Sequence, residues 1–158
     1  MINLPADDHM HEDCGIVAVY RQSAPAAELV HRSLFALQHR GQEAAGIATL
    51  GPTGHIHHLK HRGLVAESLP IFRVRDLPGN MAIGHVRYST VPMDQAENIQ
   101  PFLARTPYGR LAIAHNGNLK NAAQLTQEIE SNGILLSTTM DTELIVHAIA
   151  QSKASTFT

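Results

Sequence analysis

The chain reads Asp13-Cys14-Gly15-Ile16-Val17-Ala18-Val19-Tyr20 at the point where a polar leader gives way to an apolar run. The run from Gly15 to Tyr20 is short and rich in β-branched residues, which predicts a buried strand. Residues 1–13 show no amphipathic period, and we expect them to form a flexible leader. Cys14 is the only cysteine of the chain. Its place at this junction indicates a nucleophile that removal of the leader would expose; the alternative is a small buried cysteine that opens a strand.

Composition limits the class of protein. The 158 residues, 44% of them hydrophobic, are enough for one domain with a hydrophobic core. The net charge is −2 and the basic residues are scattered, which argues against a nucleic-acid partner. No apolar run approaches the ~20 residues of a membrane-spanning helix, and the first residues lack the features of a signal peptide. The absence of such a run argues against a membrane partner. A single cysteine forms no internal disulfide, which fits a reducing compartment, so we expect a cytoplasmic protein.

The pattern beyond Tyr20 predicts helices and strands in mixed order. Pro25 suits the first turn of a helix, and apolar residues then recur at helical spacing until Gly41. Strands near 46–50 and 56–60 form a hairpin, and further strands are predicted at 81–87 and 111–115. The polar stretch from Tyr88 to Pro101 predicts a surface loop that buries little.

Two helices are predicted in the last third of the chain. Asn121 and Gln124 form a capping pair for a helix that ends at Gly133. The next helix begins near Asp141, and its predicted buried residues are Leu144, Ile145, Ala148 and Ile149. Because strands and helices show no regular βαβ alternation, the fold class predicted is α+β.

Ordered segments downstream of Cys14 carry a family resemblance. They are Leu37-Gln38-His39-Arg40-Gly41-Gln42-Glu43-Ala44-Ala45-Gly46, Gly84-His85-Val86-Arg87-Tyr88-Ser89-Thr90, Ala114-His115-Asn116-Gly117-Asn118-Leu119 and Thr139-Met140-Asp141-Thr142-Glu143. Together they resemble the glutaminase domain of the glutamine phosphoribosylpyrophosphate amidotransferases, or amidophosphoribosyltransferases, from Cys14 to about Ala150. The Gln-His-Arg-Gly-Gln and His-Val-Arg-Tyr sequences favour these enzymes of purine synthesis over the sister amidotransferases.

The resemblance implies a particular architecture and activity. The fold would be the four-layer αββα sandwich of the N-terminal-nucleophile hydrolases, truncated at its C-terminus. Residues 1–13 would be a propeptide and 14–158 an incomplete class II glutamine amidotransferase domain, with the phosphoribosyltransferase domain absent from this chain. The activity implied is glutamine hydrolysis through a cysteine thioester, which supplies ammonia for phosphoribosylamine formation from phosphoribosylpyrophosphate, the first step of purine biosynthesis.

The catalytic residues implied are Cys14, Asn116 and Gly117. A thiol with the ordinary pKa of ~8.5 is already a few per cent thiolate at neutral pH. A free α-amino group, with a pKa of ~7.7 to 8.0, would be a suitable base, so this chemistry requires cleavage between Asp13 and Cys14. Asn116 and Gly117 offer a side-chain amide and a backbone N–H for an oxyanion hole. Alone, the Asn-Gly pair is equally typical of a turn.

The substrate-binding residues implied are Arg87, Thr90, His115 and Asp141. The planar fork of Arg87 suits the α-carboxylate of glutamine, with Thr90 nearby, although an arginine at a strand end is often only exposed. His115 would support the oxyanion turn. Asp141 would receive the α-ammonium, and a carboxylate at a helix start is also an ordinary cap.

No cofactor is expected within this chain. The resemblance implies Mg²⁺ for the phosphoribosyltransferase domain and allows an iron–sulfur cluster in the full-length enzyme, which we expect to be a homo-oligomer. His55, His57, His58 and His61 raise a metal-site hypothesis, but a solvated hairpin is the simpler interpretation. Two other functions stay open. One is a different class II amidotransferase, such as a glucosamine-phosphate synthase, which would favour Trp at the position of Tyr88; the other is an inactive binding or regulatory fragment.

Overall fold

The computed structural model describes residues 14–88, which we call the N-terminal half, and residues 98–152, which we call the C-terminal half. The elements of the N-terminal half are β1 (Gly15–Tyr20), α1 (Ala27–Ala36), the 3₁₀ turn η1 (Gln38–Arg40), β2 (Ala44–Leu50), β3 (Ile56–Arg62), α2 (Val65–Ser68), α3 (Ile71–Arg75) and β4 (Met81–Arg87). Those of the C-terminal half are β5 (Phe102–Thr106), β6 (Gly109–Ile113), α4 (Ala122–Ser131) and α5 (Asp141–Gln151).

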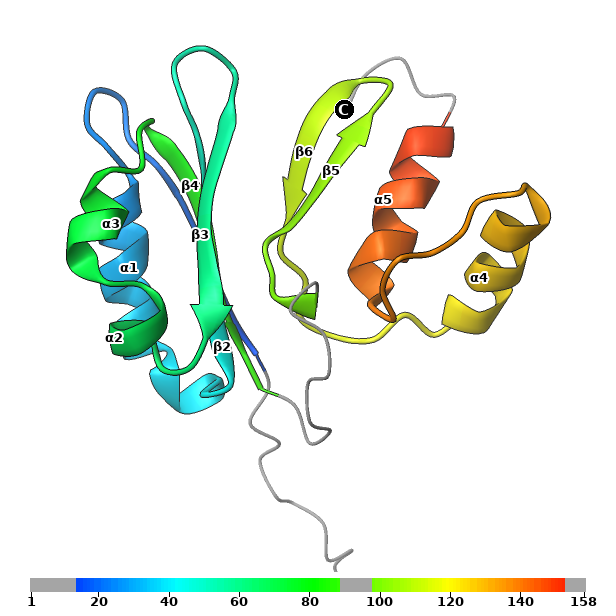
Figure 1. Ribbon diagram of the computed structural model, residues 1–158, viewed down its shortest axis with the longest axis horizontal. Coiled ribbons are helices and arrows are strands. Elements are labelled where there is room, and N and C mark those ends of the chain that lie inside the picture. Colours follow the sequence, from blue (N-terminus) through cyan, green and yellow to red (C-terminus); the bar gives the residue numbers. More distant parts are fainter. Residues whose placement is uncertain (1–13, 89–97, 153–158) are drawn as a thin grey trace, which may run out of the picture.

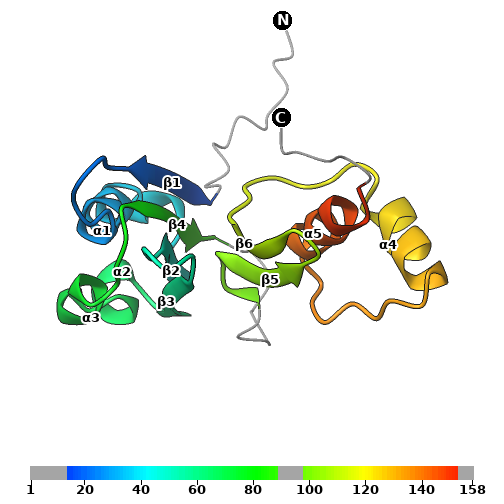
Figure 2. The ribbon, with the colours of Figure 1, turned by 90° about the horizontal axis from the view of Figure 1, so that it is seen from above.

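These elements form four layers, helices outside and sheets inside (Figure 1). Helices α1, α2 and α3 cover one face of an antiparallel sheet with the strand order β1-β4-β2-β3. The two-stranded β5–β6 sheet faces the other side of that sheet, and α4 and α5 lie beyond it, as the view from above also shows (Figure 2). The predicted αββα layering is therefore confirmed. No helix in the described ranges is both long and apolar enough to span a membrane.

The N-terminal half has a continuous hydrophobic core between α1 and the sheet. Val30 and Leu34 of α1 and Ile47 and Val86 of the sheet are all 0% exposed. Gly84 makes this close packing possible, because a Cβ there would lie 2.5 Å from Val30 Cγ1 and 2.9 Å from Leu34 Cδ1. The alternation along β4 turns Ala82, Gly84 and Val86 towards α1, so Ile83, His85 and Arg87 face the second sheet.

Much of the predicted secondary structure is confirmed. The strand at 81–87 and the hairpin of β2 and β3 are present. The strand predicted at 111–115 lies at 109–113, where it pairs with β5, which was not predicted. Helices α2 and α3 were also missed; each is too short to show a helical period. Asn121 is the N-cap residue of α4, but its side chain makes no capping hydrogen bond, so the predicted capping pair is wrong.

Three predictions about burial are wrong. The strand predicted as buried at 15–20 is the edge strand β1, with Ile16 39% and Tyr20 68% exposed, because only one neighbour, β4, pairs with it. The segment at the end of the predicted 88–101 loop is buried, with Ile99 3% and Gln100 7% exposed, because it lies against the first sheet and accepts hydrogen bonds from Lys60. Residues 89–97 of that loop lie outside the described residues. In α5, Leu144 is buried as predicted but Ala148 is exposed. The carboxylate of Glu143 points inward instead, because Ser137 and Thr138 donate hydrogen bonds to it.

Candidate active site

A pocket of about 250 Å³ lies where the two halves meet. Cys14 just before β1, Arg87 at the end of β4 and Tyr88 after it line the pocket from the N-terminal half, and Asn98 and Gln100 line it from the segment before β5. The C-terminal half contributes the loop after β6 and the start of α5, with His115, Gly117, Asn118, Thr139, Met140, Asp141 and Thr142. Five of the seven residues predicted for the site therefore line one pocket.

Cys14 stands immediately before β1, half-buried at the edge of this pocket. Its Sγ lies 3.4 Å from the backbone nitrogen of Tyr88 and 3.5 Å from the carbonyl oxygen of the same residue. The sulfur is thus held against the backbone of Tyr88 by a contact to its N–H and another to its carbonyl. The structural alternative of a cysteine packed in the core does not fit, because the sulfur is in contact with polar backbone.

The carbonyl of Cys14 is fixed by two side chains. Arg40 donates to it from Nε at 3.3 Å, and Asn116 donates from Nδ2 at 2.8 Å. Arg40 belongs to η1 and Asn116 to the loop after β6, so the residue that carries the thiol is held from both halves. An amide Nδ2 carries two N–H donors, which leaves Asn116 one for another acceptor.

Gly117 follows with a backbone that only glycine adopts readily. Its φ is +133°, while a Cβ at this position would meet nothing closer than His115 Nε2 at 3.7 Å. The glycine is therefore needed for its conformation and not for lack of space. This Asn-Gly pair lies between β6 and α4, so it belongs to a strand-to-helix connection and not to a hairpin.

Arg87 ends β4 with its guanidinium in the pocket. Nε donates to Glu43 Oε2 at 3.2 Å and Nη1 donates to the carbonyl of Asn98 at 3.1 Å. The Arg87 and Glu43 side chains are 19% and 30% exposed, so this ion pair is partly shielded from water. The guanidinium is therefore fixed in direction and holds the Asn98 segment to the first sheet, two roles that sequence reasoning did not assign to it.

Asp141 is the first residue of α5 and lines the pocket. Its Oδ2 accepts the backbone N–H of Leu119 at 2.5 Å, and the N-cap residue Met140 makes no side-chain capping bond. The carboxylate therefore ties the loop after the Asn-Gly turn to α5 instead of capping its own helix. Thr90, predicted beside Arg87, lies outside the described residues.

Behind the pocket, His85 is buried between the two sheets at 1% exposure. Neither ring nitrogen has a hydrogen-bond partner of ordinary geometry within the described ranges, although the His115 backbone is close. The pKa of His85 is lowered to about 4, above all by burial and then by the charge of Arg87, while the His115 backbone acts in the opposite direction. The ring is thus neutral at neutral pH, and no sequence pattern had distinguished it.

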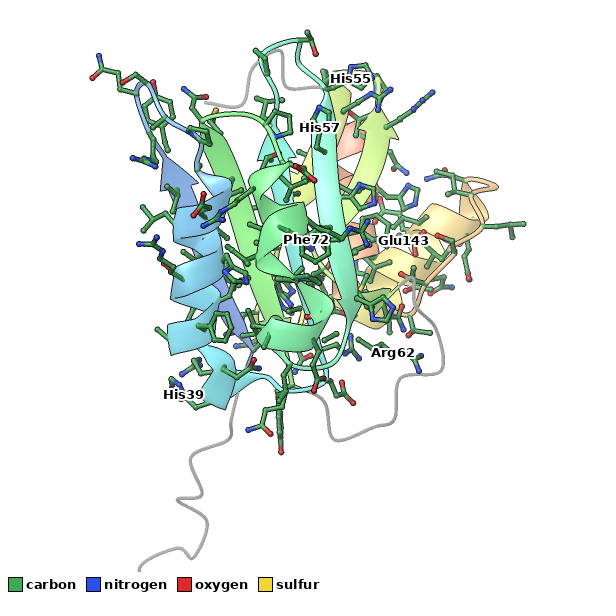
Figure 3. The ribbon with its side chains drawn as sticks, turned by 60° about the vertical axis from the view of Figure 1, so that its left-hand side comes forward. His39, His55, His57, Arg62, Phe72 and Glu143 are labelled. Atoms are coloured by element: carbon green, nitrogen blue, oxygen red, sulfur yellow. The ribbon has the colours of Figure 1, made fainter. Side chains whose placement is uncertain are left out.

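The histidines of the β2–β3 hairpin do not gather into a site. His55 and His57 lie near the hairpin tip and are exposed, with ring centroids 6.4 Å apart (Figure 3). Within the part of the chain that the structure describes, no group of three or more His, Cys, Asp or Glu residues could hold a metal ion.

Comparisons with known proteins agree with this geometry. A family model described as a glutamine amidotransferase domain matches residues 85–158. Amidophosphoribosyltransferase 3, chloroplastic, of Arabidopsis thaliana is 44% identical over 98% of this chain and 29% of its own length. The amidophosphoribosyltransferase of Archaeoglobus fulgidus is 44% identical over 87% of this chain and 30% of its own. The chain thus spans about three tenths of the length of these relatives.

Two solved structures share the fold. The structure of an allosteric regulatory enzyme of purine biosynthesis superposes with a TM-score of 0.81 and 38% identity, covering 91% of this chain and 30% of that one. The glutamine phosphoribosylpyrophosphate amidotransferase of B. subtilis, complexed with ADP and GMP, gives 0.80 and 39%, covering 89% and 30%. The fold is accordingly the αββα sandwich of the N-terminal-nucleophile hydrolases, and the chain carries glutamine amidotransferase sequence similar to that of amidophosphoribosyltransferases over about three tenths of their length.

Proposed function

We propose that this chain is the glutaminase part of an amidophosphoribosyltransferase, with Cys14 as nucleophile. The observation that carries the proposal is one pocket that holds a thiol, a fixed guanidinium and a carboxylate on different walls. Glutamine has three complementary groups: a side-chain amide, an α-carboxylate and an α-ammonium. Arg87 would bind the carboxylate, Asp141 the ammonium, and the amide would then lie at Cys14, with Thr90 assigned by resemblance alone.

The reaction follows from these positions. The sulfur of Cys14 attacks the amide carbon, and the oxyanion forms next to the side-chain amide of Asn116 and the backbone N–H of Gly117, with His115 supporting the turn. Collapse of this intermediate breaks the C–N bond, and the leaving nitrogen takes a proton and departs as ammonia. Water then hydrolyses the γ-glutamyl thioester, which releases glutamate and restores the thiol.

The proton transfers need a base close to the sulfur. We propose the α-amine of Cys14, released when residues 1–13 are removed as a propeptide, because an amide nitrogen has no basicity at neutral pH. N-terminal sequencing of active protein tests this step. Full activity in a protein that still carries Asp13 would exclude the α-amine as the base.

The remaining parts of the proposal concern the whole enzyme. Ammonia would be transferred to phosphoribosylpyrophosphate at a phosphoribosyltransferase domain, which would bind Mg²⁺. A cysteine-ligated iron–sulfur cluster does not fit this chain alone, because the chain has one cysteine and a cluster takes about four. Homo-oligomerisation and a cytoplasmic location complete the proposal, and the plant relatives are named chloroplastic.

Replacing the nucleophile tests the function directly. In the full-length protein, Cys14→Ala should abolish glutamine-dependent formation of phosphoribosylamine and leave ammonia-dependent formation intact, because free ammonia bypasses the thioester. An electrophilic glutamine analogue should label wild-type protein at Cys14, as located by peptide mass spectrometry. Equal loss of both activities, or labelling elsewhere, would refute the assignment of Cys14.

A further inference from the structure

Gln100 connects the first sheet to the loop that carries Asn116 and Gly117. Its side chain lines the pocket and is 7% exposed as a residue. Oε1 accepts the backbone N–H of His115 at 2.6 Å, one residue before Asn116. The oxygen of a glutamine side chain is thus bonded to the backbone at the entry to the proposed oxyanion turn.

The segment that carries Gln100 is itself fixed to the N-terminal half. Lys60 of β3 donates from Nζ to the carbonyl of Ile99 at 2.7 Å and to that of Pro101 at 3.4 Å. Arg87 of β4 holds the carbonyl of Asn98 at 3.1 Å. Cationic side chains from β3 and β4, the strands on either side of β2, therefore secure the backbone on both sides of Gln100.

Gly46 of β2 lets this segment approach the sheet closely. A Cβ at Gly46 would lie 2.2 Å from the carbonyl oxygen of Gln100 and 3.1 Å from its carbon. Backbone atoms cannot give way as a flexible side-chain end would, so a side chain at this position would displace the segment. The absence of a Cβ at Gly46 thus sets the depth at which Gln100 sits.

From these contacts we propose that Gln100 is a positioning residue, which fixes the Asn116-Gly117 turn relative to Cys14. This inference rests on the proposed glutaminase function. The second N–H of the Asn116 amide, and the N–H of Gly117, can stabilise an oxyanion only if the backbone points them at the correct place. The Gln100 side chain links that backbone to a segment that is itself fixed to the first sheet. Gln100 acts through the turn and takes no part in the chemical step.

The test uses three variants of the full-length protein. Gln100→Met removes the acceptor at similar volume, whereas Gln100→Glu keeps an oxygen that accepts the His115 N–H. Gln38→Met is the matched control, because Gln38 Oε1 also accepts a backbone N–H at 2.6 Å, that of Val65 in the first layer. For each variant we would measure kcat and KM for glutamine hydrolysis, the thermal midpoint, and amide hydrogen exchange of the peptide covering residues 111–119.

Gln100→Met should lower kcat by about 10- to 100-fold, the range expected when reacting groups are displaced by up to about 1 Å, and change KM little. Amide exchange across residues 111–119 should accelerate. Gln100→Glu should retain most of the activity. Gln38→Met should match the loss in thermal midpoint without the loss in kcat or the faster exchange. If Gln100→Met does not fold, Gln100→Asn, which withdraws the acceptor by one methylene, replaces it.

The outcomes separate this inference from the proposed function. Wild-type protein that neither hydrolyses glutamine nor reacts with the electrophilic analogue would refute the proposed function, and the inference with it. Active wild type together with wild-type kcat in Gln100→Met would overturn the inference alone. A Gln100→Glu variant as slow as Gln100→Met would overturn it as well, because the hydrogen-bond acceptor would then not be what matters.

Discussion

The N-terminal half buries one continuous apolar cluster, whereas the C-terminal half buries scattered side chains and leaves Leu135 91% exposed. All residues of that cluster belong to the N-terminal half, from Ala26 to Val86. The candidate site draws on both halves, with Cys14 and Arg87 from one and Asn116 and Asp141 from the other. The half with the continuous apolar cluster thus carries the nucleophile, and the other half carries the proposed oxyanion donors. Specific polar contacts must align them.

The largest expected effect concerns the difference in packing. Leu34→Ala should destabilise the protein by about 2–5 kcal/mol, in the upper part of that range, because Leu34 is 0% exposed and α1 rests directly on Gly84. Leu144→Ala in α5 should cost at most about 2 kcal/mol, because its surroundings have more room to relax. Urea denaturation measures both. Equal losses would show that the two halves are equally well packed.

The next effect concerns the alignment of the halves. Asn116→Ala should lower kcat for glutamine by about 10²- to 10³-fold, as loss of an oxyanion donor does elsewhere, and it also removes the bond to the Cys14 carbonyl. Steady-state kinetics of the full-length protein measure the effect. Asn121→Ala is the control, because the Asn121 side chain makes no capping bond at the start of α4. A similar loss in both variants would place the cause in the fold of the C-terminal half.

Local sequence patterns predicted the strands and turns that are determined by residues close together in the sequence. The strand 81–87 and the β2–β3 hairpin follow from short apolar runs and a turn between them. The site residues Cys14, Arg87, His115, Gly117 and Asp141 came from motifs and do line one pocket.

The features that sequence reasoning missed have partners far away in the chain. Gln100 was assigned to a surface loop because its neighbours are polar, yet Lys60 and Gly46 bury it. Nothing in a local pattern relates residue 46 to residue 100, or Asn116 to the carbonyl of Cys14. His85 was read only as part of a family motif, because the alternation of β4 shows which face it occupies but not that a second sheet covers that face.

The buried imidazole of His85 should make the free energy of unfolding depend on pH. Lowering its pKa from 6.5 to about 4 corresponds to about 3 kcal/mol. As pH falls below 6.5, His85 becomes protonated in the unfolded chain, whereas in the folded protein it stays neutral until about pH 4. Stability due to His85 is therefore full above pH 6.5 and is lost as pH falls towards 4.

His85→Leu should flatten the stability profile between these two pH values. The pKa of His31 is also lowered, by burial above all, so a smaller slope of the same sign should remain. Glu143 acts at lower pH: burial raises its pKa, but hydrogen bonds from Ser137 and Thr138 outweigh this and lower it overall. Denaturant melts at intervals across the range measure the slope. An unchanged slope in His85→Leu would show that water reaches the ring and that the halves are less tightly apposed.

The smallest expected effect separates the two roles of Arg87. Arg87→Lys should raise KM for glutamine by about tenfold, because an ammonium cannot make two parallel bonds to the α-carboxylate. Lysine can still form an ion pair with Glu43, so stability should fall by no more than about 1 kcal/mol, the usual value for a partly exposed pair. Glu43→Gln is the matched control, since it weakens the ion pair and keeps the guanidinium. If Glu43→Gln raises KM as much as Arg87→Lys, the direction of the guanidinium decides glutamine binding. If only Arg87→Lys raises KM, glutamine recognises the planar guanidinium itself. The hydrogen bond from Arg87 to the Asn98 carbonyl then serves the alignment of the two halves.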